Sequence, residues 1–250
     1  LLDLCYSNDL RIHIFCIKEM NFGDILIYSV PPLALTSIYL LLVRKKTDYI
    51  EKILIALLSV QSLSLIMLIS FFYTTNLEYK YVSDYSSTDL NLFYKFSGLW
   101  AGRDGTLLIW TWSATLFMIL ERKFNPTNDR QKELTTAICC LLIFGLSLIQ
   151  LYINPFRTND VIPIEGNGLN PLLLSPYMIV HPPIVFVSYG MIILLYASGM
   201  AYLITGNKNW NGTIKRWGRA SWIGMSLALI LGGYWAYVTL GWGGYWAWDP

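Results

Sequence analysis

Long stretches without a charged side chain alternate along this chain with short segments that are rich in charge. The four clearest stretches cover residues 25–43, 53–77, 134–156 and 220–248. A helix needs roughly 20 predominantly apolar residues to cross the hydrocarbon core of a bilayer. Each stretch therefore predicts a membrane-spanning helix.

Two further uncharged stretches are less regular. The first, 105–120, is short for a span. The second, 166–207, is too long for one helix. We divide it at Pro182 and Pro183, because proline suits the first turn of a helix and interrupts its interior. The predicted fold class is all-α, a polytopic integral membrane protein with about six transmembrane helices near 24–43, 52–73, 100–120, 134–153, 183–205 and 220–240.

Lysine and arginine are distributed unequally among the segments that join these helices. Four fall in each of 44–52, 121–133 and 206–219, whereas 74–99 holds two, 154–182 one and 241–250 none. Because basic residues are enriched in cytoplasmic loops, this pattern predicts that the N-terminus lies outside. The segments 74–104 and 154–182 and the tail from Gly241 would then share the outer face.

Composition agrees with a membrane location. Only 14% of the residues are charged, against about 25% in typical soluble domains. The formal net charge of +2 argues against nucleic acid as a partner. No CxxC pair, HExxH, GxSxG or Walker glycine loop occurs, which excludes the chemistry that those motifs carry. The middles of the predicted spans hold no ionisable side chain, which argues against an ion-coupled transporter.

Residues 1–19 differ from the remainder of the chain. They mix acidic and basic side chains and contain neither an apolar core nor a small-residue cleavage site, so they do not read as a secretory signal. The sequence opens with Leu1, and Met20 stands just before the first apolar stretch. We expect 1–19 to be a leader upstream of the natural start, and 20–250 to form one transmembrane domain.

Aromatic residues and glycine are concentrated toward the C-terminal end. They include Trp235, Trp242, Gly243, Gly244, Trp246 and Trp248, with Asp249 beside them. Aromatic side chains anchor helix ends at membrane interfaces, but such a belt needs only one or two per helix end. Glycine lets a ligand approach the backbone closely. The residues alone leave two interpretations open, an interfacial belt and a slot for a planar apolar ligand with Asp249 at its edge.

His181 is the one histidine outside 1–19, and it precedes Pro182 and Pro183. Proline disfavours helical geometry in the residue before it, so we expect an extended backbone at His181 and a helix that starts after it on the outer face. An interfacial histidine is often solvated or a hydrogen-bonded cap. Neutral imidazole is also the usual axial ligand of haem iron. Both interpretations stay open at this point.

Two other segments hold polar candidates. The segment 165–173 alternates glycine, asparagine and proline, which predicts consecutive turns that present His181. In 100–110, Asp104 suits a helix N-terminus. Arg103 either reaches lipid headgroups or pairs with an anionic substituent of a ligand.

In their order along the chain, these motifs resemble the haem-handling "WWD" proteins of cytochrome c maturation (the CcmF, CcmC and CcsA types). The segment 242–249 resembles their tryptophan-rich segment. Three other segments favour the CcmF branch. Its WGGxEGSLLLW stretch resembles 100–110, its NPF…GxGLNPLL stretch resembles 154–156 with 166–173, and its IHPP stretch resembles 179–183. The resemblance covers nearly all of 24–250.

The resemblance implies a role in the last step of cytochrome c biogenesis, in which haem is joined to apocytochrome c at the outer face of the cell (plasma or inner) membrane. It implies haem as the cofactor, His181 as an axial ligand of the haem iron, and 242–249 with Trp235 as a cradle for the ring. Arg103 would pair with a haem propionate. Other maturation subunits and the lipid bilayer are the further partners it implies. No residue stands out as catalytic, so whether the chain is an enzyme stays open.

The chain departs from the family pattern at two places. Arg103 stands where bacterial members often have a histidine, so the role of that histidine is not transferred. The chain stops at Pro250, whereas the family continues with helices that carry a second outer histidine and, in CcmF, the histidines of a bound haem b. We therefore expect the N-terminal part of a longer or split protein. Two other functions stay open, a haem exporter or carrier and a non-catalytic scaffold subunit of a respiratory membrane complex.

Overall fold

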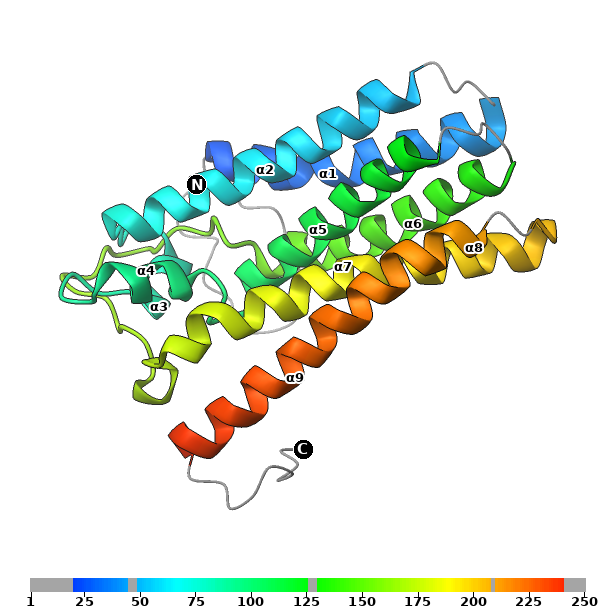
Figure 1. Ribbon diagram of the computed structural model, residues 1–250. Helices are drawn as coiled ribbons and strands as arrows, with labels where there is room; N and C mark the ends of the chain where they lie inside the picture. The colour runs from blue at the N-terminus through cyan, green and yellow to red at the C-terminus, as the bar shows by residue number, and fades with distance from the viewer. Residues whose placement is uncertain (1–19, 45–48, 126–129, 208–209, 241–250) are drawn as a thin grey trace, which may run out of the picture.

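A computed structural model describes residues 20–44, 49–125, 130–207 and 210–240. Within these residues the chain is helical, with one isolated antiparallel bridge between Tyr79 and Thr158 and no strand. The long helices lie side by side as a bundle, and the short helices α3 and α4 cover one of its ends (Figure 1). The predicted all-α class is confirmed.

Six long helices build the bundle. They are α1 (Phe22–Tyr39, continued by a π turn at Leu40–Arg44), α2 (Ile50–Thr74), α5 (Arg103–Phe124), α6 (Arg130–Ile153), α7 (Pro176–Thr205) and α9 (Arg219–Leu240). The shorter elements are α3 (Lys80–Tyr85), α4 (Leu92–Gly98), a 3₁₀ turn at Pro171–Leu173, α8 (Trp210–Thr213) and a π turn at Ile214–Gly218.

Among the described residues, five helical segments are long and apolar enough to cross a membrane. They are Phe22–Val43, Ile50–Thr74, Arg130–Ile153, Pro176–Thr205 and Asn211–Thr239. The sixth long helix, α5, packs against α2, α6 and α7. It buries the polar Thr111, Ser113 and Thr115, which a helix surrounded by other helices accommodates more readily than one facing lipid. The count of six spans and the outside N-terminus stay predictions.

One predicted boundary is wrong. The helix expected to begin at 183 begins at Pro176, and Pro182 and Pro183 lie inside it. Proline disfavours a helix interior because it removes an N–H donor and crowds the preceding turn. At α7 the first of these losses is offset by a donor from another part of the chain, as described below.

Small residues bring the helices close together. A Cβ atom added to Gly190 of α7 would lie 2.3 Å from the Ser113 hydroxyl of α5, and one added to Gly224 of α9 would lie 2.2 Å from the Ser188 hydroxyl of α7. Membrane helices associate through such close packing of small residues. Both contacts place α7 at the centre, between α5 and α9.

A polar network joins the helices at the end of the bundle opposite α3 and α4. The Glu121 carboxylate of α5 accepts hydrogen bonds from the Thr213 hydroxyl at 2.6 Å, from Arg216 Nη1 at 2.7 Å and from Trp217 Nε1 at 2.7 Å. Glu121 is buried. A buried charge needs such partners, so this carboxylate holds the segment before α9 against the bundle.

Replacing Glu121→Gln tests this network. The amide carries no charge and turns an N–H group toward donors, so we expect the free energy of unfolding to fall by roughly 3 kcal/mol. Reversible unfolding in mixed micelles measures it. Glu133→Gln is the matched control, because the Arg130–Glu133 pair is long, at 3.8 Å, and its arginine is half exposed. Equal losses in the two variants would contradict the role of Glu121.

Candidate functional site

Two segments distant in sequence fold together over one end of the bundle, and we call residues 75–102 and 154–175 the cap. The connection between α6 and α7 runs along α3 and α4 there, and α7 begins and α9 ends on the same side (Figure 1). The sequence predicted that these two segments share a face, and they do. The tail from Gly241 lies outside the described residues.

Hydrogen bonds tie the two segments of the cap to each other. The Asn159 side chain donates to the Leu77 carbonyl and to the Ser83 hydroxyl, both at 2.9 Å. The backbone N–H and the hydroxyl of Thr88 both donate to the Glu165 carboxylate. These bonds, followed by one from the Gly166 N–H, lower the pKa of Glu165. Glu165 therefore holds the two segments of the cap together.

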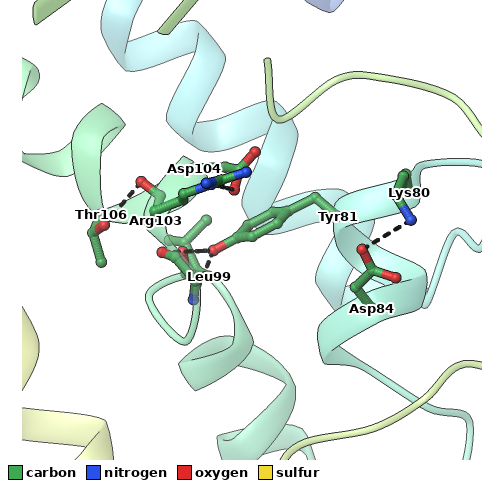
Figure 2. Close-up of polar contacts among 8 residues, drawn as sticks. Lys80, Tyr81, Asp84, Leu99, Arg103, Asp104 and Thr106 are labelled. Carbon is green, nitrogen blue, oxygen red and sulfur yellow. Dashed lines mark hydrogen bonds and ion pairs between the residues drawn. The ribbon is translucent and has the colours of Figure 1, made fainter. Parts of the chain in front are cut away.

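The start of α5 is built around a buried tyrosine. The Tyr81 hydroxyl lies 3.0 Å from the Leu99 carbonyl and 3.1 Å from the Gly102 carbonyl, and it accepts the Gly102 N–H at 3.2 Å (Figure 2). Burial raises the pKa of Tyr81. A Cβ atom on Gly105 would lie 1.7 Å from the Leu99 carbonyl oxygen, so glycine is required there. This turn places Arg103 at the first position of α5.

Arg103 projects away from the turn that holds it. Its side chain is 78% exposed, and its one ion pair among the described residues is to Asp104, at 4.0 Å. Figure 2 shows the guanidinium beside this carboxylate, above the Tyr81 ring. A pair this long and this exposed contributes little. The guanidinium thus stays available to an anionic group at the cap end of the bundle.

His181 stands inside α7 rather than before a helix, which corrects the extended geometry expected from the following proline. Pro182 has no N–H, so the Met178 carbonyl lacks its helical donor. The Trp100 indole N–H donates to that carbonyl at 2.7 Å. This bond satisfies the carbonyl that Pro182 leaves without a donor, and the helix runs through both prolines and continues past His181.

The His181 ring lies directly against the backbone of α9. Its Nδ1 is 2.8 Å from the Ala228 carbonyl oxygen, and a Cβ atom on Gly232 would lie 2.7 Å from its Cε1. A carbonyl can only accept, so Nδ1 carries the proton and Nε2 keeps its lone pair. Nε2 makes no hydrogen bond within the described residues. It is the group that a metal would meet.

Trp235 occupies the same face of α9, since positions 228, 232 and 235 follow helical spacing. It is partly buried, and its Nε1 is buried without a hydrogen-bond partner in the described part of the chain. A buried indole N–H usually has an acceptor. The α9 face that contacts His181 therefore also carries Trp235. The sequence predicted these two site residues separately.

The remaining candidates lie beyond the described residues. Trp242, Gly243, Gly244, Trp246, Trp248 and Asp249 all belong to 241–250, and their grouping with His181 stays a prediction. Within the described residues, no cluster of three or more histidine, cysteine, aspartate or glutamate side chains is placed to hold a metal. His181 is the one histidine among the described residues.

Sequence reasoning missed three residues that set the geometry of this site. Tyr81 gave no signal, because nothing local distinguishes it from other interfacial tyrosines. Trp100 belongs to one of the motifs that carry the resemblance, but no role was assigned to it. The available signal was a proline inside a helix, because it leaves the carbonyl four residues earlier without its donor. Gly232 begins a Gly-Gly pair in an apolar helix, a pattern that indicates close approach of another group.

Comparisons with known proteins agree with this architecture. The model of a family described as cytochrome C assembly protein matches residues 100–250. The cytochrome c-type biogenesis protein NrfE of Haemophilus influenzae is 34% identical over 175 residues, covering 68% of this chain and 28% of NrfE. CcmF of Escherichia coli is 34% identical over 194 residues, covering 74% of this chain and 29% of CcmF.

A solved structure shares the fold. A structure titled Cytochrome c Heme Lyase CcmF superposes with a TM-score of 0.72 at 22% identity, over 91% of this chain and 37% of that chain. The chain therefore spans well under half the length of these relatives, and it shares its arrangement of helices with the aligned part of the solved protein.

Replacing Trp100→Phe should remove the donor and keep the aromatic ring. The Met178 carbonyl would be left unpaired in an apolar contact, so we expect a loss of about 1–3 kcal/mol in unfolding free energy, measured in mixed micelles. Trp112→Phe is the control, because its indole donates to the Ser62 hydroxyl at 2.9 Å and a serine hydroxyl in a helix can bond its own backbone instead. A larger loss in the control would contradict the role of Trp100.

Replacing Gly232→Ala should push the His181 ring off α9 and break its bond to the Ala228 carbonyl. Gly233→Ala is the matched control, since no atom lies within 4 Å of its added Cβ and alanine favours the helix by up to about 1 kcal/mol. Imidazole ¹⁵N NMR measures the result, with His13 as the only other histidine signal. We expect the His181 Nδ1 shift to move in the first variant alone; unchanged spectra in both would refute the contact.

Proposed function

Because this chain belongs to the cytochrome c assembly protein family, with CcmF and NrfE proteins among its relatives, we propose that it acts in cytochrome c maturation as the haem-binding component of a haem lyase. In this role it holds haem at the outer membrane face for covalent attachment to apocytochrome c. The observation that carries the proposal is the His181 ring, whose Nδ1 is held at the Ala228 carbonyl of α9 while its Nε2 makes no hydrogen bond within the described residues.

The residues present fit a haem. An axial ligand needs a neutral imidazole with one nitrogen free and the other fixed by a hydrogen bond, because the second bond orients the ring and raises its basicity. The 2.8 Å contact between His181 Nδ1 and the Ala228 carbonyl supplies that bond. Arg103, exposed at the same end of the bundle, suits a propionate, and Trp235 offers an indole with a free N–H.

The protein's contribution in this proposal is orientation. When bound, haem supplies the vinyl groups that react with cysteine thiols to form thioether bonds. The chain holds the iron through His181 and the ring edge through 242–249 and Trp235, so that the thiols meet the vinyl groups in one geometry. No side chain of this chain is assigned as a general acid or base.

The proposal extends to the organisation of the whole protein. Residues 20–250 form one haem-handling membrane unit, and 1–19 stand apart from it. The relatives are about three and a half times as long as the matched part. In this proposal a second axial ligand comes from a further part of a longer or split protein, and other maturation subunits take part. The membrane is the cell's plasma or inner membrane, with the cap outside the cytoplasm.

The test is haem absorbance in the full-length natural protein, purified from its membrane. We expect a Soret band that is lost or strongly reduced by His181→Ala and weakened by Trp235→Phe and Trp246→Ala. Trp222→Phe is the control, because that side chain is 72% exposed on α9 and lies at the opposite end of the helix. Haem content that does not change in any variant would exclude the proposal and favour a scaffold.

A further inference from the structure

A short apolar strip stands out from the surface of the cap. Within 161–164, Val161 is 83% exposed, Ile162 61% and Ile164 100%. Single exposed apolar residues are common on proteins. Three in four consecutive positions form a continuous apolar surface, which is a feature of sites that bind another molecule.

The strip is anchored at both of its ends. Before it, the Asn159 N–H donates to the Glu78 carbonyl at 2.8 Å, in addition to the two side-chain bonds of Asn159. After it, Thr88 holds Glu165, and the Gly168 N–H donates to the Ser86 carbonyl at 3.0 Å. An anchored loop loses less conformational entropy on binding than a free one. The apolar side chains are therefore already held in place before a partner binds.

The backbone of the strip is also unpaired. The N–H groups of Val161, Ile162 and Ile164 make no hydrogen bond within the described residues, and Pro163 has no N–H. The chain bends at Val161 and Ile164, so a partner that pairs with these N–H groups must follow a bent backbone. A flexible polypeptide segment follows it more closely than a rigid folded surface does.

The surroundings of the strip are acidic. The cap contains five acidic and three basic residues. Two of the acidic residues, Asp160 and Glu165, flank the strip directly in sequence. A third, Asp89, follows Thr88, the residue that donates to Glu165. The hydrogen bonds that lower the pKa of Glu165 keep its charge at mildly acidic pH. This charge attracts a basic segment and opposes the approach of an anionic lipid surface.

The strip belongs to the connection between α6 and α7, which passes over α3 and α4 at the cap end of the bundle (Figure 1).

We propose that the strip 161–164 is the docking surface for a flexible, basic segment of the polypeptide that receives haem. This inference rests on the proposed function, because the polypeptide that it names is the apocytochrome. Substitutions in the strip therefore lower the affinity for the polypeptide and leave haem ligation unchanged.

The experiment uses the full-length natural protein in its membrane, with a photo-crosslinking residue in place of Ile164. The probe is a reduced, fluorescent peptide that contains Cys-x-x-Cys-His flanked by lysines. We expect a crosslink that weakens with salt, and a Kd raised roughly tenfold or more by the combined Val161→Ser, Ile162→Ser and Ile164→Ser variant, with the Soret band unchanged. A peptide with glutamate in place of lysine should bind weakly.

The matched control is the Leu172→Ser, Leu174→Ser variant, whose residues are exposed on the same connection but outside the strip. A Kd raised equally in the control, a crosslink only to lipid in phosphatidylglycerol-containing vesicles, or a crosslink to another part of the same chain would overturn the inference. Those outcomes leave the Soret band in place. Loss of the band with peptide binding retained would refute the proposed function instead.

Discussion

Pro182 removes a backbone donor from α7 one position after the candidate haem ligand, and the indole of Trp100 supplies another donor in its place. An unpaired carbonyl in an apolar bundle costs about 1–3 kcal/mol, and more in lipid. The Trp100–Met178 bond therefore offsets the donor that α7 loses at Pro182. It also joins the cap to α7, so the position of His181 depends on a contact between two segments that are far apart in sequence.

The helix α9 depends on α7 in turn. In its most apolar window only 6% of the residues are buried, against 28–39% in the other four candidate spans, because it packs mainly along α7. The contact is close because Gly232 leaves room for the imidazole ring. His181 therefore has two functions in the structure. Its Nδ1 joins the two helices, and its Nε2, which makes no hydrogen bond within the described residues, is the atom proposed to bind the haem iron.

The two ends of the bundle are held in different ways. At one end, buried Glu121 joins α5 to the segment that precedes α9 through charge-assisted hydrogen bonds. At the other end, the cap is held by many neutral hydrogen bonds and by the Glu165–Thr88 and Lys95–Thr75 contacts, with Arg103 and the strip 161–164 left exposed. Rigid anchoring at one end and accessible polar and apolar groups at the other suit a protein that positions a cofactor for a second molecule.

The sequence by itself determined the class of fold and most helix boundaries, because the cost of placing charge in hydrocarbon depends little on which helices are neighbours. It also singled out His181, Arg103 and Trp235 by residue type and motif. Only the tertiary structure decided the helical backbone of His181, since a donor from Trp100 outweighs the local preference that Pro182 imposes. The partner of Nδ1 and the need for Gly232 were likewise beyond local rules, because both are set by how closely α7 and α9 approach.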